Sequence, residues 1–280
     1  MSLQLRLLRW IAVCLPMLAL PGNAARAEEV AKLFSAHARG SAATVDHAAW
    51  SGLLRRYTVL DGKGLRRVRY AAWKAEGRAA LDAYIASLER VAVARLDRAE
   101  QFAFWANLYN AKTIAIVLDK YPVKSIKDIS LGGSFLATFT GGPWKAKVVK
   151  VSGHDLSLDD IEHGILRPIF KDPRVHYAVN CASVGCPNIG GEAFTGAKLE
   201  TQLDAAAKAY VNSPRGVSLA RGGVTASSIY TWFQADFGGD AAGVLAHLQR
   251  YAEPGLRAKL APVTAIDGYV YDWTLNDAGN

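Results

Sequence analysis

The stretch Arg174-Val-His-Tyr-Ala-Val-Asn-Cys-Ala-Ser-Val-Gly-Cys-Pro187 combines an alternating apolar pattern with two thiols. Val175, Tyr177 and Val179 alternate with smaller or polar residues, which predicts a strand that runs into Cys181. A short Ser/Gly loop then leads to Cys186. Thiols at the end of a strand, close to a histidine and an asparagine, indicate either sulfur chemistry or a loop closed by a disulfide.

The N-terminus predicts where the protein works. Residues 1–27 have the pattern of a cleaved secretory signal peptide, with two early arginines, an apolar run over Trp10–Leu20 and Ala25-Arg26-Ala27 as cleavage site. The apolar run is shorter than the ~20 residues that a membrane-spanning helix needs. We therefore expect a soluble periplasmic or secreted protein that begins near Glu28 and has no transmembrane segment after cleavage. The third cysteine lies within the signal, so two thiols remain.

Composition and charge exclude some kinds of partner. About half of all residues are apolar, 51%, which is enough for a proper core. Three basic residues and no acidic residue lie in the signal, so the formal charge of +8 falls to +5 after cleavage. The basic residues are scattered along the chain and form no concentrated stripe with stacking aromatics, so we expect no nucleic-acid partner. An unknown small molecule or a component of the cell envelope remains as the expected partner.

The periodicity along the chain favours a mostly helical α+β fold. Apolar residues at helical spacing predict helices in residues 28–100, most clearly over Ala79–Leu96, and again over Ala241–Tyr251. Alternation predicts strands over Lys145–Val151 and Gly268–Thr274. Helices outnumber strands and do not alternate regularly with them, so we expect a small, mainly antiparallel sheet around the cysteine loop.

The expected domain organisation follows the same pattern. After the signal, residues 28–100 form a helical lead-in that packs on a main α+β domain, residues 101–280. No Pro/Gly/Ser-rich linker separates the two parts. The Gly-rich segment Leu131–Pro143 is expected to be a long loop between helical and strand-rich parts.

A helix over Phe102–Leu118 is predicted to lie in the core, because it is apolar nearly all round. Asn107 and Asn110 lie on this helix, and an unpaired buried amide costs about 1–3 kcal/mol. Either these amides hold a neighbouring loop, or one of them binds a carbonyl or orients a catalytic group. Both alternatives stay open.

A second unusual helix is predicted to begin at Ser157, where Ser-Leu-Asp-Asp resembles a capping box. At about 100° per residue, Glu162 falls in the middle of the buried face and His163 at its margin. A carboxylate on an apolar face is paired or has a raised pKa. We expect either an ion pair with Arg167 or Arg174, or a role as general acid/base or as the group that orients a histidine.

Three mechanisms compete at the cysteine loop. A Cys181–Cys186 disulfide would close a small loop, which an exported protein can keep oxidised. Alternatively, Cys181 is a nucleophile with His163 or His176 as base and Glu162 as orienting group. In an alternating strand His176 and Cys181 point to opposite faces, which makes His163 the easier base.

The third mechanism, a zinc site, has a weak signal, because the two cysteines are four residues apart and lack a second pair. The absence of C-x-x-C disfavours thioredoxin-like redox chemistry. We therefore predict neither a metal nor a cofactor.

The residues of these segments together resemble a known family, domain of unknown function 547. The resemblance extends from about Gln101 to Phe237, with small departures at Ala106 and Phe233. Its ordered motifs are Phe104–Asn110, Tyr121–Ile126, Leu156–His163, Asp172–Ser183, Cys186-Pro187 and Trp232–Phe237.

The family's activity is not established, so the resemblance places residues more than it assigns a function. It places on its motifs Asn107, Asn110, Glu162, His163, His176, Asn180, Cys181, Ser183 and Cys186. Some eukaryotic relatives join this domain to glutaredoxin-like and DEP domains, which implies a connection with thiols.

Two functions remain open. The first is a thiol-dependent hydrolase or acyl/amide transferase in which Cys181, His163 or His176 and Glu162 are catalytic. In that case Asn107, Asn110, Asn180 and Ser183 assist binding. The second is a non-enzymatic envelope module whose Cys181–Cys186 disulfide shapes a cleft for a ligand or partner.

Overall fold

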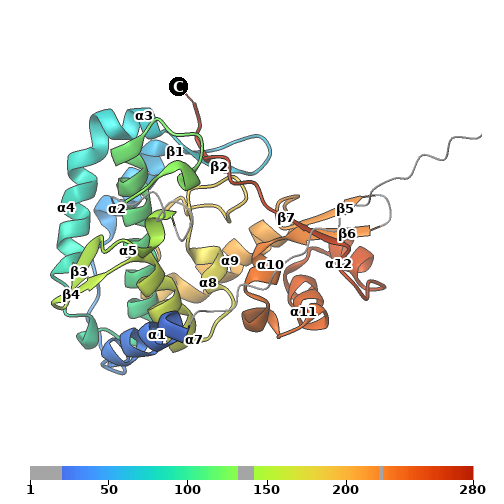
Figure 1. Ribbon diagram of the computed structural model, residues 1–280, viewed down its shortest axis with the longest axis horizontal. Helices are drawn as coiled ribbons and strands as arrows, with labels where there is room; N and C mark the ends of the chain where they lie inside the picture. The colour runs from blue at the N-terminus through green and yellow to red at the C-terminus, as the bar shows by residue number, and fades with distance from the viewer. Residues whose placement is uncertain (1–20, 132–141, 221–222, 280) are drawn as a thin grey trace, which may run out of the picture.

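The computed structural model describes residues 21–131, 142–220 and 223–279. Figure 1 shows a larger lobe with α1 to α5 and a smaller lobe with α10 to α12 and the strands β5 to β7. The chain returns at its C-terminal end from β7 to the larger lobe. Most of the predicted signal peptide lies outside the described residues. The predicted cleavage site lies within α1, Pro21–Leu33.

The larger lobe is built around one helix, α5, Arg98–Lys120. Asp97 caps it by accepting a hydrogen bond from the backbone N–H of Ala99 (3.1 Å), which satisfies one of the free donors of the first turn. All but a few of its residues are buried, as its apolar composition predicts. Helices α3, Tyr70–Ala72, and α4, Arg78–Glu89, pack against it, and α2, Ala48–Tyr57, packs against α4.

Residues 28–100 share the larger core with α5. Trp50, Trp73 and Tyr84 from this segment are buried in the same apolar cluster as Trp105 of α5. A π-turn, Trp73–Gly77, joins α3 to α4. The helix predicted over Ala79–Leu96 is shorter than expected, because α4 ends at Glu89 and a 3-10 turn, Val93–Arg95, follows.

The strands form three small sheets. Two are antiparallel hairpins: β1, Thr58–Leu60, with β2, Arg66–Val68; and β3, Val149–Val151, with β4, His154–Leu156. The third contains β5, Val217–Ala220, β6, Gly223–Ser227, and β7, Gly268–Val270, where β5 and β6 are antiparallel and β6 and β7 parallel. The predicted strands at 145–151 and 268–274 are present only in part.

The smaller lobe has its own core. Helices α9, Leu199–Val211, α10, Ile229–Trp232, α11, Ala241–Tyr251, and α12, Pro254–Leu260, bury a second apolar cluster that includes Tyr177 and Tyr210. Helix α11 has the bounds predicted from its periodicity. Further short 3-10 turns lie between these elements of the two lobes, at Ile126–Asp128, Gly142–Lys145, Gly196–Lys198 and Gln234–Phe237.

The strand predicted before the cysteines is wrong. Residues Val175–Ala178 form a short helix, α8, in which the N–H of Val179 donates to the carbonyl of Val175 (3.2 Å). Residues 175–180 are all buried, so their alternation does not reflect one buried and one exposed face. The argument that His176 and Cys181 occupy opposite strand faces therefore does not apply.

The helix predicted from Ser157 is present. It consists of a π-turn, Asp160–Leu166, and the helix α7, Arg167–Phe170. Ser157 and Asp160 exchange the hydrogen bonds expected of a capping box, with the Ser157 N–H donating to Asp160 Oδ2 (2.8 Å). Glu162 is buried on the core side and His163 is partly exposed at its margin, as the periodicity predicts.

The C-terminal segment, residues 271–278, crosses from the smaller lobe to the larger one and is called the strap below. It pairs with the cysteine loop through the N–H of Val184, which donates to Thr274 O, and the N–H of Asn276, which donates to Ala182 O (2.8 and 3.1 Å). It ends beside β2, where the N–H of Ala278 donates to Val68 O (2.9 Å). The strap thus fixes the cysteine loop to both lobes.

These elements confirm the predicted α+β class, predominantly helical with small, mainly antiparallel sheets. The predicted loop over Leu131–Pro143 lies almost entirely outside the described residues. Within the ranges that the structure describes, no helix is both long and apolar enough to cross a membrane.

Candidate functional site at the cysteine loop

Four polar side chains meet at the cysteine loop: Cys181, Ser183, Cys186 and Tyr271, called the thiol cluster below. The Tyr271 hydroxyl lies 3.0 Å from Cys181 Sγ, 3.2 Å from Cys186 Sγ and 2.8 Å from Ser183 Oγ. Ser183 Oγ lies 3.2 Å from Cys181 Sγ. Both cysteines are free thiols in the structure, so the predicted disulfide remains a prediction for the oxidised protein.

The two sulfurs differ in ionisation. Cys186 Sγ accepts a hydrogen bond from the backbone N–H of Cys181 (3.0 Å) and one from Tyr271. Burial by itself raises the pKa of Cys186, but hydrogen bonds from Cys181 and Tyr271 outweigh it and lower that pKa below its ordinary value. The hydrogen bond to Cys186, followed by burial, raises the pKa of Cys181. Of the two sulfurs, Cys186 therefore loses its proton more readily than Cys181.

The two thiols also differ in access. Cys181 is partly exposed, whereas Cys186 is 4% exposed. Burial, followed by the negative charge on the sulfurs, raises the pKa of Tyr271 well above its ordinary value. Tyr271 consequently stays protonated and acts as a donor to Cys186 Sγ. The accessible sulfur has the higher pKa, and the sheltered sulfur has the lower one.

The backbone between the thiols is held in an unusual conformation. Ala182 has φ of +62°, a left-handed conformation that costs an alanine about 1–2 kcal/mol. Its N–H donates to Asn180 Oδ1 (2.9 Å), and its carbonyl accepts from the N–H of Asn276. Such strain persists where surrounding contacts over-determine it, and it is common at functional sites. Here it lies between the two sulfur-bearing residues.

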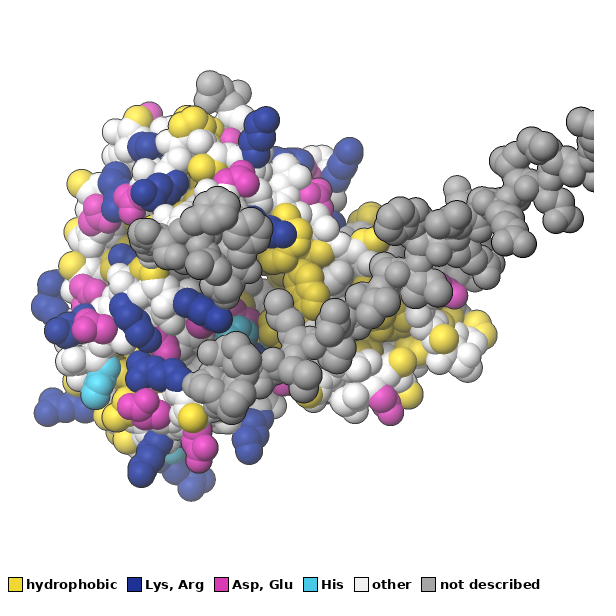
Figure 2. All heavy atoms as spheres, in the orientation of Figure 1, with side chains coloured by type: hydrophobic (Ala, Val, Ile, Leu, Met, Phe, Trp, Pro, Cys, Tyr) yellow, Lys and Arg dark blue, Asp and Glu magenta, His cyan; other side chains and the backbone are white. Residues whose placement is uncertain are grey.

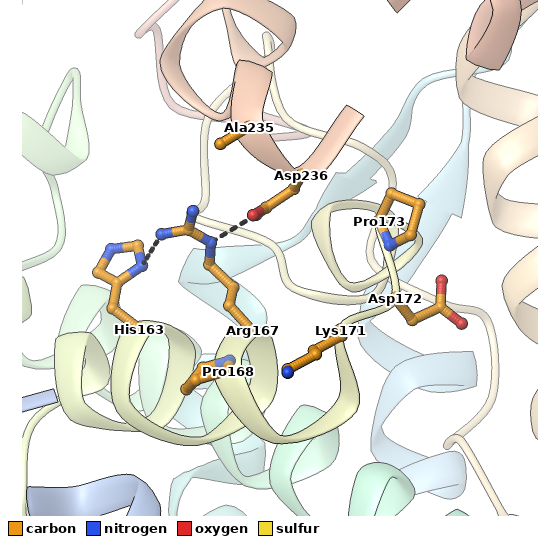
Figure 3. A pocket seen from close by; sticks show the side chains of 8 residues that line it. All are labelled: His163, Arg167, Pro168, Lys171, Asp172, Pro173, Ala235 and Asp236. Atoms are coloured by element: carbon orange, nitrogen blue, oxygen red, sulfur yellow. Dashed lines mark hydrogen bonds and ion pairs between the residues drawn. The ribbon is translucent and has the colours of Figure 1, made fainter. Parts of the chain in front are cut away.

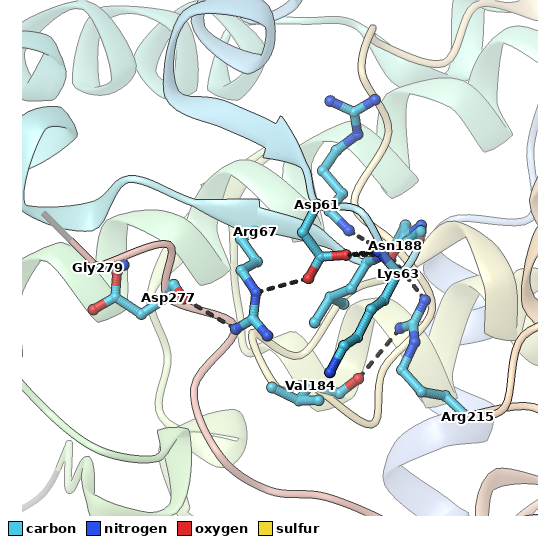
Figure 4. A network of polar contacts seen from close by, with 11 residues as sticks. Asp61, Lys63, Arg67, Val184, Asn188, Arg215, Asp277 and Gly279 are labelled. Carbon is cyan, nitrogen blue, oxygen red and sulfur yellow. Dashed lines mark hydrogen bonds and ion pairs between the residues drawn. The ribbon is translucent and has the colours of Figure 1, made fainter.

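The strap approaches the cysteine loop at a glycine. The N–H of Gly185 donates to Asp272 O (2.8 Å), and a Cβ on Gly185 would lie 2.8 Å from Asp272 N. A larger residue at this position would push the strap away from the loop. On the other side, Arg215 donates to the carbonyls of Val184 and Cys186, as part of the polar network in Figure 4.

The three asparagines predicted as binding residues hold backbone in the structure. Asn107 and the backbone of Phe194 exchange two hydrogen bonds (2.8 and 3.0 Å). Asn110 donates to Ala178 O and accepts from the N–H of Asn180 (both 2.8 Å). Asn180 also donates to Pro187 O (2.6 Å). These contacts support the first of the two alternatives, in which the asparagines hold neighbouring loops.

The two predicted histidines belong to another group of side chains, the Asp236 cluster, which comprises His163, Arg167, His176 and Asp236. Asp236 Oδ2 accepts from Arg167 Nε (2.6 Å) and lies 2.7 Å from His176 Nε2. Arg167 Nη1 lies 3.2 Å from His163 Nδ1. His163, Arg167 and Asp236 line a cavity of about 470 Å³ (Figure 3).

The ionisation of the Asp236 cluster follows from these pairs. Burial raises the pKa of Asp236, but the hydrogen bonds from His176 and Arg167 outweigh it and hold that pKa well below its ordinary value. Burial lowers the pKa of His176, despite the opposing hydrogen bond to Asp236. The imidazole of His176 is thus neutral, with its Nε2–H donating to a carboxylate, and it stacks on Phe233 at 4.2 Å.

The prediction that Glu162 forms an ion pair with Arg167 or Arg174 is wrong. Arg167 pairs with Asp236, and Arg174 pairs with Asp172, Glu200 and Asp204. Glu162 Oε1 instead lies 4.0 Å from His163 Nδ1. Its second neighbour is the hydroxyl of Tyr109, a fully buried residue of α5.

Tyr109 connects Glu162 electrostatically with the thiol cluster. Burial raises the pKa of Tyr109 well above its ordinary value, and the charges of Glu162, Cys181 and Cys186 add to this effect. The tyrosine therefore lies within electrostatic reach of both groups. Among the hydrogen bonds of the described residues, however, none joins His163 or His176 to a thiol.

The structure thus brings together Cys181, Ser183 and Cys186 and places His163 and His176 in a separate hydrogen-bonded cluster. Sequence reasoning did not select Tyr271, Tyr109 or Asp236. Tyr109 and Asp236 lie within the quoted motifs, so their positions were available as a signal. No pattern in the sequence pointed to Tyr271. The described part of the chain holds no group of three or more His, Cys, Asp or Glu side chains suited to a metal ion.

Residues 93–211 match the family model described as protein of unknown function, DUF547. This segment of the chain is similar to the DUF547 family. The comparisons found no matching curated protein and no matching solved structure. The matched segment ends with α9, so it contains both cysteines and Glu162, while Tyr271 and Asp236 come from residues that follow it.

Proposed function

We propose that the DUF547-like segment of this chain is an exported thiol–disulfide exchange centre. In this proposal Cys181 and Cys186 pass between the dithiol and the disulfide. The observation that carries it is the hydrogen bonding of Cys186 Sγ, which receives the Cys181 N–H and the Tyr271 hydroxyl beside an accessible thiol. Neutral donors around Cys186 Sγ favour its thiolate, which can take up the proton that Cys181 must lose when it attacks a disulfide.

The first chemical step uses the accessible sulfur. Cys181 Sγ attacks one sulfur of a substrate disulfide, and its proton passes to the Cys186 thiolate with which it shares a hydrogen bond. A bond forms between Cys181 and the substrate sulfur, the substrate S–S bond breaks, and the other substrate sulfur leaves as a thiolate. The product is a mixed disulfide at Cys181 beside a Cys186 thiol.

The second step uses the sheltered sulfur. Cys186 Sγ attacks Cys181 Sγ, and its proton goes to the departing substrate sulfur, which leaves as a thiol. The protein loses two electrons and ends with the Cys181–Cys186 disulfide, and the substrate disulfide is reduced to a thiolate and a thiol. The same steps in reverse oxidise a substrate dithiol.

The spacing of the cysteines argued against redox chemistry in the sequence, because C-x-x-C is absent. Exchange is supported without that motif by the left-handed turn at Ala182 and by contacts that both thiols share: the Cys181 N–H bonds to Cys186 Sγ, and the Tyr271 hydroxyl lies beside both sulfurs. An oxidising compartment, which the signal-like N-terminus predicts, suits this chemistry.

Acyl transfer by Cys181 is less well supported. It requires a base in contact with the thiol, for which His163 or His176 was predicted. Arg167 and Asp236 engage these two imidazoles. Of the described groups around Cys181 Sγ, those in contact are hydroxyls and the second thiol. These neighbours serve exchange better than acylation.

The proposal is tested by trapping the mixed disulfide. Reduced wild-type protein, Cys181→Ser and Cys186→Ser are incubated with glutathione disulfide and followed by intact mass. We expect a persistent glutathione adduct only in Cys186→Ser, because its Cys181 can attack but nothing resolves the product. The wild type is expected to pass to the internal disulfide and to return to the dithiol in excess reduced glutathione.

Two other outcomes would reject exchange. A wild-type disulfide that glutathione does not equilibrate, with no adduct in either variant, would support the disulfide-clamped binding module. A Cys186→Ser variant that hydrolyses a model ester as fast as the wild type would support a Cys181 nucleophile without a resolving partner. Circular dichroism of each variant controls for folding.

A further inference from the structure

An exposed aromatic surface adjoins the thiol cluster. Tyr271, whose hydroxyl contacts both sulfurs, also packs its ring on Trp232 and Trp273, with centroids 4.8 and 4.6 Å away. Trp232 and Trp273 stack at 5.6 Å, and Trp144 meets Trp273 edge-on at 6.2 Å. The ring of Tyr271 therefore belongs to this surface while its hydroxyl belongs to the site.

The surface is open to solvent. Trp232 is 47% exposed, which is unusual for the largest apolar side chain. In Figure 2, hydrophobic side chains gather between the two lobes, over the region where Figure 1 shows α10 and β7. Exposed groups of aromatic side chains on a soluble protein are typical of interaction sites, because aromatic rings supply large contact areas at a low cost in conformational entropy.

The rings form a surface rather than a cage. Trp232, Tyr271 and Trp273 touch one another at 4.6 to 5.6 Å, which leaves no room for a small cation between them. A ligand must instead lie across their outer faces. An extended chain of several residues fits such a surface better than a compact small molecule.

A hollow beside these rings carries a net negative charge. Tyr271 and Trp273 line a cavity of about 820 Å³ together with three carboxylates, Asp128, Asp272 and Asp277, and one ammonium group, Lys124. A second ammonium group, that of Lys127, lies 5.2 Å from the centre of the Trp273 ring, so three carboxylates face two cations. In the described ranges none of these carboxylates has an ion-pair partner. Their hydrogen bonds come from neutral donors, such as the Tyr121 hydroxyl on Asp277. The hollow therefore favours a basic group.

We propose that the aromatic surface of Trp232, Tyr271 and Trp273 binds a polypeptide substrate of the thiol pair, a segment that has basic residues near its cysteine. This inference rests on the proposed exchange function and adds the substrate class. Apolar side chains of the segment lie on the indole faces, and a lysine or arginine lies by the carboxylates of the hollow. The substrate cysteine then meets Cys181 at the hydroxyl end of Tyr271.

The test compares two substrates with the same leaving group. One is a short basic peptide whose single cysteine forms a mixed disulfide with thionitrobenzoate; the other is free cysteine in the same mixed disulfide. Release of thionitrobenzoate gives kcat/KM for each. We expect Trp232→Ala to lower the peptide-to-cysteine ratio of kcat/KM by about tenfold, the effect of losing one ring that anchors the chain.

Leu60→Ala is the matched control, because Leu60 is likewise an exposed apolar side chain, 54% exposed on β1, and is not one of the rings of the aromatic surface. It is expected to keep the wild-type ratio. A peptide with glutamate in place of its basic residues is expected to react more slowly with the wild type. A ratio that neither Trp232→Ala nor the glutamate peptide changes would overturn the inference and leave the exchange function standing.

Loss of the exchange function would be visible separately, because neither substrate would then release thionitrobenzoate. In that case a peptide with serine in place of cysteine reports binding alone, through the tryptophan fluorescence of the wild type. Equal affinity of the wild type and Trp232→Ala for this peptide would reject the surface. Weaker binding by Trp232→Ala would support it.

Discussion

The thiol cluster and the Asp236 cluster place ionisable groups in opposite surroundings. In the Asp236 cluster a carboxylate receives both a guanidinium and an imidazole, so its charge is matched by its neighbours. In the thiol cluster the contacts of Cys186 Sγ are a backbone N–H, the hydroxyls of Tyr271 and Ser183 and a second thiol, all neutral. A matched charge stabilises a structure, whereas neutral donors around a sulfur set its reactivity.

This difference explains why the predicted residues separate. Sequence reasoning placed Cys181, His163 and His176 in one mechanism, because histidine is the usual base for a thiol. The structure gives each histidine a partner of its own, and it gives the thiols Tyr271. The predictions below test the separation, from the largest expected effect to the smallest.

The largest effect is expected for the thiol itself. Cys181→Ser should lower the rate of exchange with glutathione disulfide by roughly a hundredfold or more, because no accessible sulfur remains to attack. His163→Gln should stay within about threefold of the wild type, because His163 makes no hydrogen bond to a described thiol. An equal loss of exchange rate in both variants would contradict the separation and show that the two clusters act in one mechanism.

The contact between the strap and the cysteine loop should be the next most sensitive. Gly185→Ala places a methyl group against Asp272 and should lower the free energy of unfolding by about 1–3 kcal/mol, measured in urea. Alkylation of Cys181 should become faster as Tyr271 moves away. Gly62→Ala is the control, because a Cβ there meets no atom within 4 Å. Equal effects in both would show that the strap does not hold the loop.

Acid is expected to destabilise the fold through His247, a partly buried histidine of α11 that lies outside the thiol cluster. Burial, helped by Arg250, lowers the pKa of His247 from 6.5 to about 4. The unfolded chain therefore binds the proton first, and stability is lost as pH falls from about 6.5 towards 4. The loss attributable to His247 is about 2 kcal/mol at pH 5 relative to pH 7 or above.

This loss is measured by urea unfolding at pH 7 and pH 5. His247→Gln should reduce the difference between the two conditions, because glutamine does not titrate and can still bond to the Tyr177 hydroxyl, 2.8 Å from His247 Nε2. The rate of thiol exchange per folded molecule should be the same in His247→Gln and in the wild type at both pH values. An unchanged pH dependence in His247→Gln would contradict the prediction.

The smallest effect is expected at Tyr271. Tyr271→Phe removes one of the donors to Cys186 Sγ and should raise the pKa of that thiol, while the donor from the Cys181 backbone remains. Thiolate absorbance as a function of pH measures the shift. Tyr269→Phe is the control, because its hydroxyl has no hydrogen bond in the described structure and should leave the titration unchanged. A fall in the pKa would show that Tyr271 does not donate to the thiolate.

Local pattern was enough for the elements whose burial depends on their own composition. Helix α5 is apolar all round and is the centre of the larger core, and the amphipathic helix α11 has its predicted bounds. Glu162 lies on the buried face as its helical phase requires. These features depend on residues a few positions apart, which interact whatever the rest of the chain does.

Predictions from local periodicity were wrong where contacts between distant residues determine the backbone conformation or the pairing of a side chain. The alternation before Cys181 predicted a strand, but residues 175–180 are buried on all sides, and α8 forms instead. The predicted ion pair of Glu162 was wrong for the same reason, since Arg167 pairs with Asp236, which lies 69 positions further along the chain. Local periodicity contains no information about such partners.

The sequence by itself determined the α+β class, the buried helix with its asparagines and the cysteine loop as the chemically distinctive segment. Only the tertiary structure decided which residues share a site. Tyr271 lies about 90 positions beyond Cys181 and meets it because the strap returns from the smaller lobe. The ionisation of a thiol depends on the donors within hydrogen-bond distance, and here folding brings one of them, Tyr271, from the other end of the chain.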